Sequence, residues 1–168
     1  MHKNMAGKVK SVPEGMHSIT PHLVVRNAIE AIDFYRKALG AEAKGVHRTP
    51  DGKVMHAELK VGNSMIFLAD EFPGMGTCAS PQTLGGNSIT LNLYTDNVDQ
   101  LFNRAVAAGA TVVMPLANQF WGDRYGQIKD PFGHTWALGQ HVEDVTPEEM
   151  ERRGREAFAQ MAKNKGKS

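Results

Sequence analysis

One stretch of this sequence recurs at an offset of 70 residues, counted from residue 19 to residue 89. Residues 19–25 read Ile-Thr-Pro-His-Leu-Val-Val and residues 89–95 read Ile-Thr-Leu-Asn-Leu-Tyr-Thr, with Asn27 and Asn97 following at the same offset. In both copies a strand-like run precedes a helix-like run, and a repeat of this length indicates a duplicated supersecondary unit. Two such units are expected to pack against each other, with the function in the crevice between them.

Each copy predicts one strand, one helix and three further strands. In the first copy the helix starts after the N-cap Asn27 and ends at Gly40, and the strands are predicted at 18–25, 41–48, 54–61 and 64–69. In the second copy the helix starts after Asp96 or Asn97 and ends at Gly109, and the strands are predicted at 88–95, 111–114, 125–129 and 135–140. The sequence therefore predicts an α+β fold of two tandem βαβββ modules, at 17–70 and 88–141, joined by a linker or lid at 71–87.

A further helix is predicted within residues 142–163, after the second module. Thr146 is a suitable N-cap, Pro147 fits the first helical position, and Glu149 completes a capping box. A narrow apolar stripe follows, made of Met150, Ala157, Phe158 and Met161. This stripe fits either the body of the same chain or a partner subunit.

The charge distribution argues against a nucleic-acid-binding protein. The formal net charge is +1, but six lysines lie near the chain ends: Lys3, Lys8, Lys10, Lys163, Lys165 and Lys167. The rest of the chain is acidic, whereas a nucleic-acid-binding domain needs a basic face. The segments 1–16 and 164–168 are expected to be disordered tails.

The cysteine content and the hydropathy pattern favour a cytoplasmic protein. Cys78 is the only cysteine, which excludes an internal disulfide and suits a reducing compartment. The N-terminus lacks the apolar core of a secretory signal. No run approaches the roughly 20 apolar residues of a membrane helix.

Four short motifs, together with the duplication, resemble the vicinal oxygen chelate superfamily of glyoxalases, bleomycin-resistance proteins and extradiol dioxygenases. Two of them are Ile32-Asp33-Phe34-Tyr35 in the first helix and Asp130-Pro131-Phe132-Gly133-His134 before the last strand. Two others, His56-Ala57-Glu58-Leu59 and Trp121-Gly122-Asp123-Arg124-Tyr125-Gly126, are similar to its PhnB-like branch. The resemblance covers roughly residues 17–145. It implies curled sheets that form an incomplete barrel around a small-molecule cavity, and often a homodimer.

The resemblance also identifies four positions at which metal-dependent members hold an ion. They fall on the first and fourth strands of each module, at Thr20, Phe67, Thr90 and Ala137. Threonine is a poor ligand for a divalent ion, and phenylalanine and alanine are not ligands. We therefore expect no cofactor and no metal at the usual site.

The Gly62-Asn63 turn predicts the pairing of the third and fourth strands of the first module. Val61 should pair with Ser64, Leu59 with Ile66, Glu58 with Phe67, and His56 with Ala69. Because cross-strand partners share a face, a cavity lined by Phe67 also receives His56 and Glu58. The predicted lining consists of Thr20, His22, His56, Glu58, Met65, Phe67, Thr90 and Asn92.

Glu58, His56 and His22 are the candidate catalytic residues. Glu58 could act as a general base, with a histidine as its orienting partner. Alternatively, Glu58 and His56 hydrogen-bond across the sheet and only line a binding pocket. In a third reading, His22, His56 and Glu58 form a displaced metal site, since two histidines and one carboxylate are a recognised iron or zinc set.

The insert at 119–124 has no counterpart in the first copy and is predicted to close one end of the cavity. Trp121, Asp123, Arg124 and Tyr125 are therefore candidate substrate-binding residues. Arg124 could clamp an anionic group, or it could pair with Asp123 or with the opposite module. Cys78 reads as a free surface thiol, His134 as structural, and His141 belongs to no recognisable constellation.

Two functions from different classes remain open. The first is a metal-independent lyase or isomerase of the glyoxalase-like group, with Glu58 as base and Arg124 holding an anion. The second is a protein that sequesters a drug or metabolite without turnover. In both cases the expected partners are a small molecule and a second copy of the chain, with no nucleic acid and no membrane.

Overall fold

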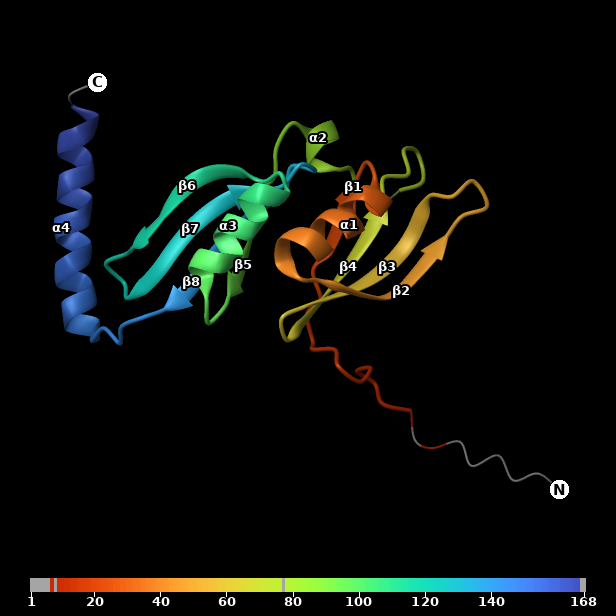
Figure 1. The fold of residues 1–168 in the computed structure, drawn as a ribbon, viewed down its shortest axis with the longest axis horizontal. Coiled ribbons are helices and arrows are strands. Elements are labelled where there is room, and N and C mark those ends of the chain that lie inside the picture. Colours follow the sequence, from red (N-terminus) through yellow and green to blue (C-terminus); the bar gives the residue numbers. More distant parts are fainter. Residues whose placement is uncertain (1–6, 8, 77, 167–168) are drawn as a thin grey trace. The chain divides into compact units, whose positions relative to one another are not determined.

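A computed structural model describes residues 7, 9–76 and 78–166 (Figure 1). The elements, in chain order, are β1 (His22–Val25), α1 (Ala28–Leu39), β2 (Glu42–Arg48), β3 (Val54–Val61), β4 (Ser64–Asp70), α2 (Pro81–Leu84), β5 (Thr90–Tyr94), α3 (Val98–Ala108), β6 (Thr111–Asn118), β7 (Asp123–Lys129), β8 (Thr135–His141) and α4 (Pro147–Lys165).

The strands form two four-stranded sheets of identical topology. Their orders are β1-β4-β3-β2 and β5-β8-β7-β6, and in each sheet the first pair is parallel while the others are antiparallel. This confirms the α+β fold of two βαβββ modules. Neither sheet closes into a barrel. The chain divides into two compact units with a boundary between Ser80 and Pro81. Strands β1–β4 lie in the first unit, and β5–β8 and α4 lie in the second.

Several elements differ in extent from the sequence predictions. β1 begins at His22 rather than at residue 18, and the short helix α2 lies inside the predicted linker 71–87. β6 and β7 are longer than predicted, so the insert at 119–124 becomes a tight hairpin turn. α4 continues to Lys165, beyond the expected end at 163. The disorder predicted for 1–16 and 164–168, and with it Lys3, Lys8 and Lys167, lies in part outside the described residues.

The two helices of the repeat begin in the same way. Asn27 and Asn97 are the N-caps, and their side chains accept hydrogen bonds from the backbone N–H groups of Glu30 and Gln100. Because such a cap satisfies an N–H group that the helix leaves unpaired, a local sequence signal is enough to set the start of each helix.

A long-range contact is also repeated. In the first unit the Ala28 amide donates to Asp70 Oδ1 over 2.8 Å, and in the second the Val98 amide donates to Gln140 Oε1 over 3.1 Å. The residues of the two pairs match at the offset of the sequence repeat. Each contact links the first turn of a helix to the strand that comes last in the sequence of the same module, β4 or β8.

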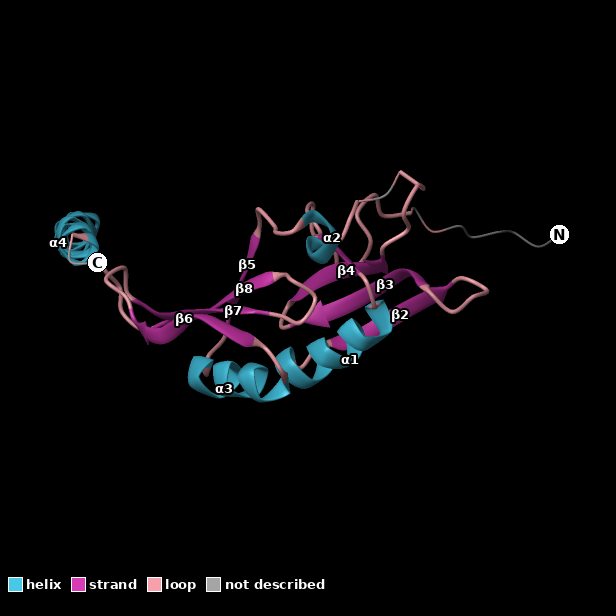
Figure 2. Ribbon diagram, turned by 90° about the horizontal axis from the view of Figure 1, so that it is seen from above, coloured by secondary structure: helices cyan, strands magenta, loops and turns pink. Residues whose placement is uncertain are grey.

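One face of each sheet is covered by its helix. In the first unit Leu23, Ala57, Leu59, Ile66 and Leu68 are buried, and Figure 2 shows α1 and α3 each lying along one side of a sheet. These side chains form the core face of β3 and β4. The side chains that alternate with it therefore point to the opposite, open face. Among the described residues, no helix has both the length and the apolar character needed to cross a bilayer.

Candidate binding site on the first sheet

Three residues from three adjacent strands form a row across the open face of the first sheet. Phe67 on β4 pairs with His22 on β1 and with Glu58 on β3. The predicted pairs 61–64, 59–66 and 58–67 are thus confirmed. His22, and not Thr20, is the residue beside Phe67, because Thr20 precedes the start of β1.

His56 joins this row through aromatic contacts. Its ring centroid lies 4.6 Å from that of Phe67, and the His22 ring lies 6.1 Å from each of them in an edge-on arrangement. His56 Nε2 is 3.7 Å from Glu58 Oε1, longer than a good hydrogen bond. Four of the predicted lining residues therefore lie on one face: His22, His56, Glu58 and Phe67.

The environment of His22 favours its neutral form. Partial burial of the ring lowers the pKa of His22 below 6.5, and the neighbouring His56 lowers it further. An uncharged imidazole has one donor and one acceptor nitrogen. His22 is therefore available at neutral pH as a hydrogen-bonding group for an uncharged ligand.

A pocket of about 510 Å³ lies beside His22, within the first unit. Its walls are largely apolar, with Val24, Met55, Ala69, Phe72 and Met75 among the lining residues. Asp70 also lines it, but both carboxylate oxygens accept backbone hydrogen bonds, from Ala28 and Val54. Thr49 lines it too, but its hydroxyl is engaged with the Asp51 carboxylate and the Lys53 carbonyl. His22 is therefore the main polar side chain that this pocket offers to a ligand.

One wall of the pocket belongs to the segment after β4. Glu71 closes the base of this segment by accepting hydrogen bonds from the backbone and the hydroxyl of Ser80, over 3.0 and 3.3 Å. Met75, which is 74% exposed, lies between Gly74 and Gly76, both of which have positive φ angles. The arrangement is a loop with a fixed base and a projecting tip, and its role as a lid stays a prediction.

A second, smaller hollow of about 290 Å³ lies on the same unit and includes Glu58, Lys60, Asn63 and Met65. Glu58 thus lines a charged hollow, whereas His22 lines the apolar pocket. The predicted lining residues of the first module are divided between two recesses. This division separates the proposed base from the apolar pocket beside His22.

The second sheet places Asn92 and Thr90 at positions equivalent to His22 and Thr20. Asn92 pairs with Ala137 as His22 pairs with Phe67, and Thr90 pairs with Thr135. Both side chains are exposed. Whether they share a cavity with the first module stays a prediction.

Asp123 is the centre of a polar network in the second unit. This 4% exposed residue accepts hydrogen bonds from Tyr94 Oη over 2.8 Å and from Trp121 Nε1 over 3.1 Å. Its other oxygen lies 2.9 Å from His141 Nδ1, and His141 Nε2 lies 2.8 Å from Asp144 Oδ1. The prediction that His141 belongs to no constellation is therefore wrong, and Asp144 was not among the predicted residues.

Arg124 has a partner that the sequence did not suggest. Its guanidinium makes two hydrogen bonds to Asp99, of 2.9 and 2.8 Å, and a third to Asn118. Asp123 is engaged elsewhere, so a pairing of Asp123 with Arg124 is wrong. An anion clamp at Arg124 would have to displace the Asp99 carboxylate. The Trp121 ring packs edge-on against Tyr125, with centroids 5.3 Å apart.

The donor set of the first sheet does not match a preformed metal centre. Among the described residues, no group of three or more histidine, cysteine, aspartate or glutamate side chains is placed to hold an ion. The side chains at Phe67 and Ala137 supply no donor atoms, and the displaced site at His22, His56 and Glu58 stays a prediction. Cys78 is free and exposed at the rim of the larger pocket.

Comparison with known proteins gives a consistent assignment. The sequence model described as "Glyoxalase/Bleomycin resistance protein/Dioxygenase superfamily" matches residues 15–138. An uncharacterized protein of Mycobacterium bovis is 47% identical over 136 residues, which cover 80% of this chain and 90% of its own length.

Solved structures show the same fold. TioX from Micromonospora sp. ML1 is 26% identical with a TM-score of 0.60, covering 75% of this chain and 99% of its own. A PhnB protein from Bacillus cereus, described as a putative 3-demethylubiquinone-9 3-methyltransferase, is 21% identical with a TM-score of 0.58. It covers 74% of this chain and 99% of its own.

Proposed function

Because this chain belongs to the glyoxalase/bleomycin resistance protein/dioxygenase superfamily, we propose that it binds a small organic molecule in the pocket beside His22. We propose further that it sequesters this molecule without turning it over. The proposal rests chiefly on one observation, which is the apolar pocket of about 510 Å³ in the first unit. Ligand pockets of soluble proteins commonly have volumes of roughly 300–1,000 Å³ and are lined mainly by apolar side chains.

The lining indicates the class of ligand. Val24, Met55, Phe72 and Met75 offer apolar and thioether surface, which adapts to ligands of irregular shape. His22 is held neutral by burial and by its neighbour His56, so it can hydrogen-bond one polar atom of an uncharged ligand. A largely apolar, neutral molecule with one such polar atom fits best.

A charge introduced at Met55 should test the binding proposal. Met55 is 58% exposed, so Met55→Glu should leave the fold intact while placing a carboxylate in the apolar wall. We expect this change to raise the Kd for the neutral dye Nile red at least about ten-fold, whereas the volume-matched Met55→Leu stays within about two-fold. Fluorescence titration measures both. Equal affinities for the two variants would refute binding at this pocket.

A proton-transfer enzyme is the second candidate, supported by the placement of His56 Nε2 3.7 Å from Glu58 Oε1. The location of Glu58 in the smaller, charged hollow makes this candidate the weaker of the two. If Glu58 is a base, Glu58→Gln should abolish turnover of any substrate found by screening, since an amide cannot accept the proton. Nile red affinity should change by no more than a few-fold. A sequestering protein would show no turnover in either form.

A further inference from the structure

The smaller hollow of the first unit presents two opposite charges, those of Glu58 and Lys60. The two residues lie two positions apart on β3, so their side chains leave the strand on the same face, about 7 Å apart. Within the described part of the chain they form no ion pair with each other. A carboxylate and an ammonium group therefore line one recess without neutralising each other.

Lys60 lacks the carboxylate partner that its position in the sheet would supply. Its neighbour on β2 is Glu42, but the Glu42 carboxylate binds Lys44 over 2.6 Å. Lys44 is also the main cause of the lowered pKa of Glu42, to which Lys60 contributes least. Among the described residues no carboxylate forms an ion pair with Lys60, so its ammonium group is available to an anionic group of a ligand.

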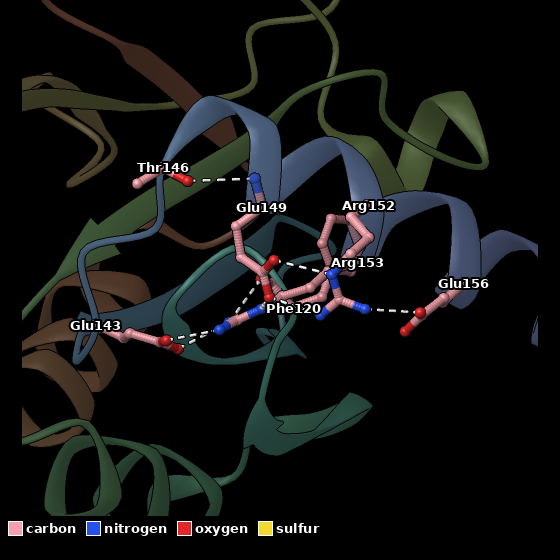
Figure 3. Close-up of polar contacts among 7 residues, drawn as sticks. All are labelled: Phe120, Glu143, Thr146, Glu149, Arg152, Arg153 and Glu156. Carbon is pink, nitrogen blue, oxygen red and sulfur yellow. Dashed lines mark hydrogen bonds and ion pairs between the residues drawn. The ribbon is translucent and has the colours of Figure 1, made fainter.

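Neighbouring charges on the C-terminal helix show the opposite arrangement, because they neutralise each other. On α4, Arg153 forms ion pairs with Glu143 and Glu149, at 2.7 and 2.8 Å (Figure 3). Such pairs leave little charge for a ligand, whereas Glu58 and Lys60 keep both of theirs.

Glu58 has open space beside its carboxylate. His56 Nε2 lies 3.7 Å from Glu58 Oε1, too far for a good hydrogen bond. On the β2 side Glu58 is paired with Gly45, and cross-strand partners share a face. A Cβ atom at Gly45 would meet one atom within 4 Å, His47 Nε2 at 3.9 Å. The missing side chain thus leaves room for a ligand next to Glu58.

Two methionines supply the apolar part of the hollow. Met65 is the partner of Lys60 on β4, and Met16 belongs to the segment before β1; both line the hollow and are half-buried. Thioether side chains adapt to apolar groups of different shape. The volume of about 290 Å³ is near the lower end of the roughly 300–1,000 Å³ usual for ligand pockets, which indicates a small ligand.

We propose that this hollow is a second ligand site, which binds a small zwitterion: an α-amino acid with an unbranched apolar side chain. The ammonium group of the ligand donates to the Glu58 carboxylate, and its carboxylate accepts from the Lys60 ammonium group. Its side chain lies against Met16 and Met65. Both contacts are charge-assisted hydrogen bonds, which are stronger than neutral ones. The site is separate from the pocket beside His22, so the inference does not rest on ligand binding there, and it requires no turnover.

Three ligands with the same apolar chain test the proposal on the unmodified protein. L-norleucine carries both charges, 1-aminopentane keeps only the ammonium group, and hexanoate keeps only the carboxylate. L-norleucine should bind at least about five-fold more tightly than either of the others, because each of them leaves one side chain of the site without its hydrogen-bonded ion pair. Ligand-observed NMR titration measures the three Kd values. No saturable binding of L-norleucine, or binding no tighter than that of the better analogue, would overturn the proposal.

Removing one charge of the protein at a time assigns each end of the ligand to its side chain. Lys60→Met should bind L-norleucine no more tightly than 1-aminopentane, since the ligand carboxylate has lost its partner. Glu58→Gln should bind L-norleucine no more tightly than hexanoate, since the ligand ammonium group has lost its carboxylate. If either variant keeps the full preference of the unmodified chain for L-norleucine, that contact is wrong.

Lys163→Met is the matched control for Lys60→Met. Lys163 is an exposed lysine of α4 and does not line the hollow. The Kd for L-norleucine should rise at least about five-fold in Lys60→Met and stay within about two-fold in Lys163→Met. Equal Kd values would place the binding elsewhere on the chain. Nile red affinity should be the same in both variants, because Lys60 does not line the pocket beside His22, so failure of one site is distinguishable from failure of the other.

Discussion

Replacing Asp123 with alanine should lower the free energy of unfolding of the second unit by about 3 kcal/mol, since it strands several hydrogen-bonding groups around a buried position. Tyr94 Oη, Trp121 Nε1 and His141 Nδ1 all meet this one carboxylate. Trp121 and Trp136 are the only tryptophans of the chain, and both lie in the second unit. Urea unfolding followed by tryptophan fluorescence therefore reports on this unit.

Asp144→Ala is the matched control for Asp123→Ala. Asp144 contacts the other ring nitrogen of His141, but its side chain is fully exposed, and exposed ion pairs contribute at most about 1 kcal/mol. The two variants thus compare a buried and a solvated partner of the same ring. Equal losses would show that the buried contacts of Asp123 add no more stability than the exposed contact of Asp144.

The same network should give the second unit a pH window of maximal stability. Burial disfavours the charged form of Asp123, but hydrogen bonds from His141, Tyr94 and Trp121 outweigh it and lower the pKa of Asp123 below 3.8. Hydrogen bonds to Asp144 and Asp123 raise the pKa of His141 above 6.5. A lowered carboxyl pKa gives stability that is lost as the pH falls through it, and a raised histidine pKa gives stability that is lost as the pH rises through it.

The unfolding midpoint in urea should therefore be highest between these two pKa values and decline on either side. His141→Gln should remove the alkaline decline that this group causes and retain the acidic one, because Asp123 keeps its other donors. A series of urea titrations from acidic to alkaline pH measures both limbs.

Local chemistry accounts for what the sequence predicted well. The N-caps Asn27 and Asn97 act on the adjacent turn, and the Gly62-Asn63 turn sets the pairing of Glu58 with Phe67. These signals need no knowledge of the tertiary structure. They were sufficient to predict the duplicated topology and to predict which side chains lie on the open face of the first sheet.

The predictions that failed depend on contacts between separate elements. Arg124 on β7 forms an ion pair with Asp99 on α3. No spacing in the sequence predicts this pair. The contact of Asp123 with His141 could have been predicted from the sequence, because the hairpin that pairs Lys129 with Thr135 also pairs Asp123 with His141. The pocket residues Phe72 and Met75 lie in the loop after β4, where the path of the chain has no periodic signal.

Replacing Asp70, which links helix α1 to strand β4 in the first unit, should also lower the free energy of unfolding strongly. Asp70 is 6% exposed and accepts from the buried amides of Ala28 and Val54, over 2.8 and 2.7 Å. Asp70→Ala leaves both amides without a partner, at roughly 1–3 kcal/mol each. We expect a loss of about 3 kcal/mol in the free energy of unfolding, measured by urea titration with far-ultraviolet circular dichroism.

The second copy of the repeat supplies the control for Asp70, because Gln140 at the equivalent position accepts from one helix amide, that of Val98. Gln140→Ala should therefore cost about 1 kcal/mol, a third of the loss at Asp70. Asp70→Asn keeps one carbonyl oxygen as acceptor and should fall between the two. If Asp70→Ala and Gln140→Ala cost the same, the second hydrogen bond of Asp70 adds nothing. A single hydrogen bond would then stabilise the contact between helix and last strand equally well within each unit.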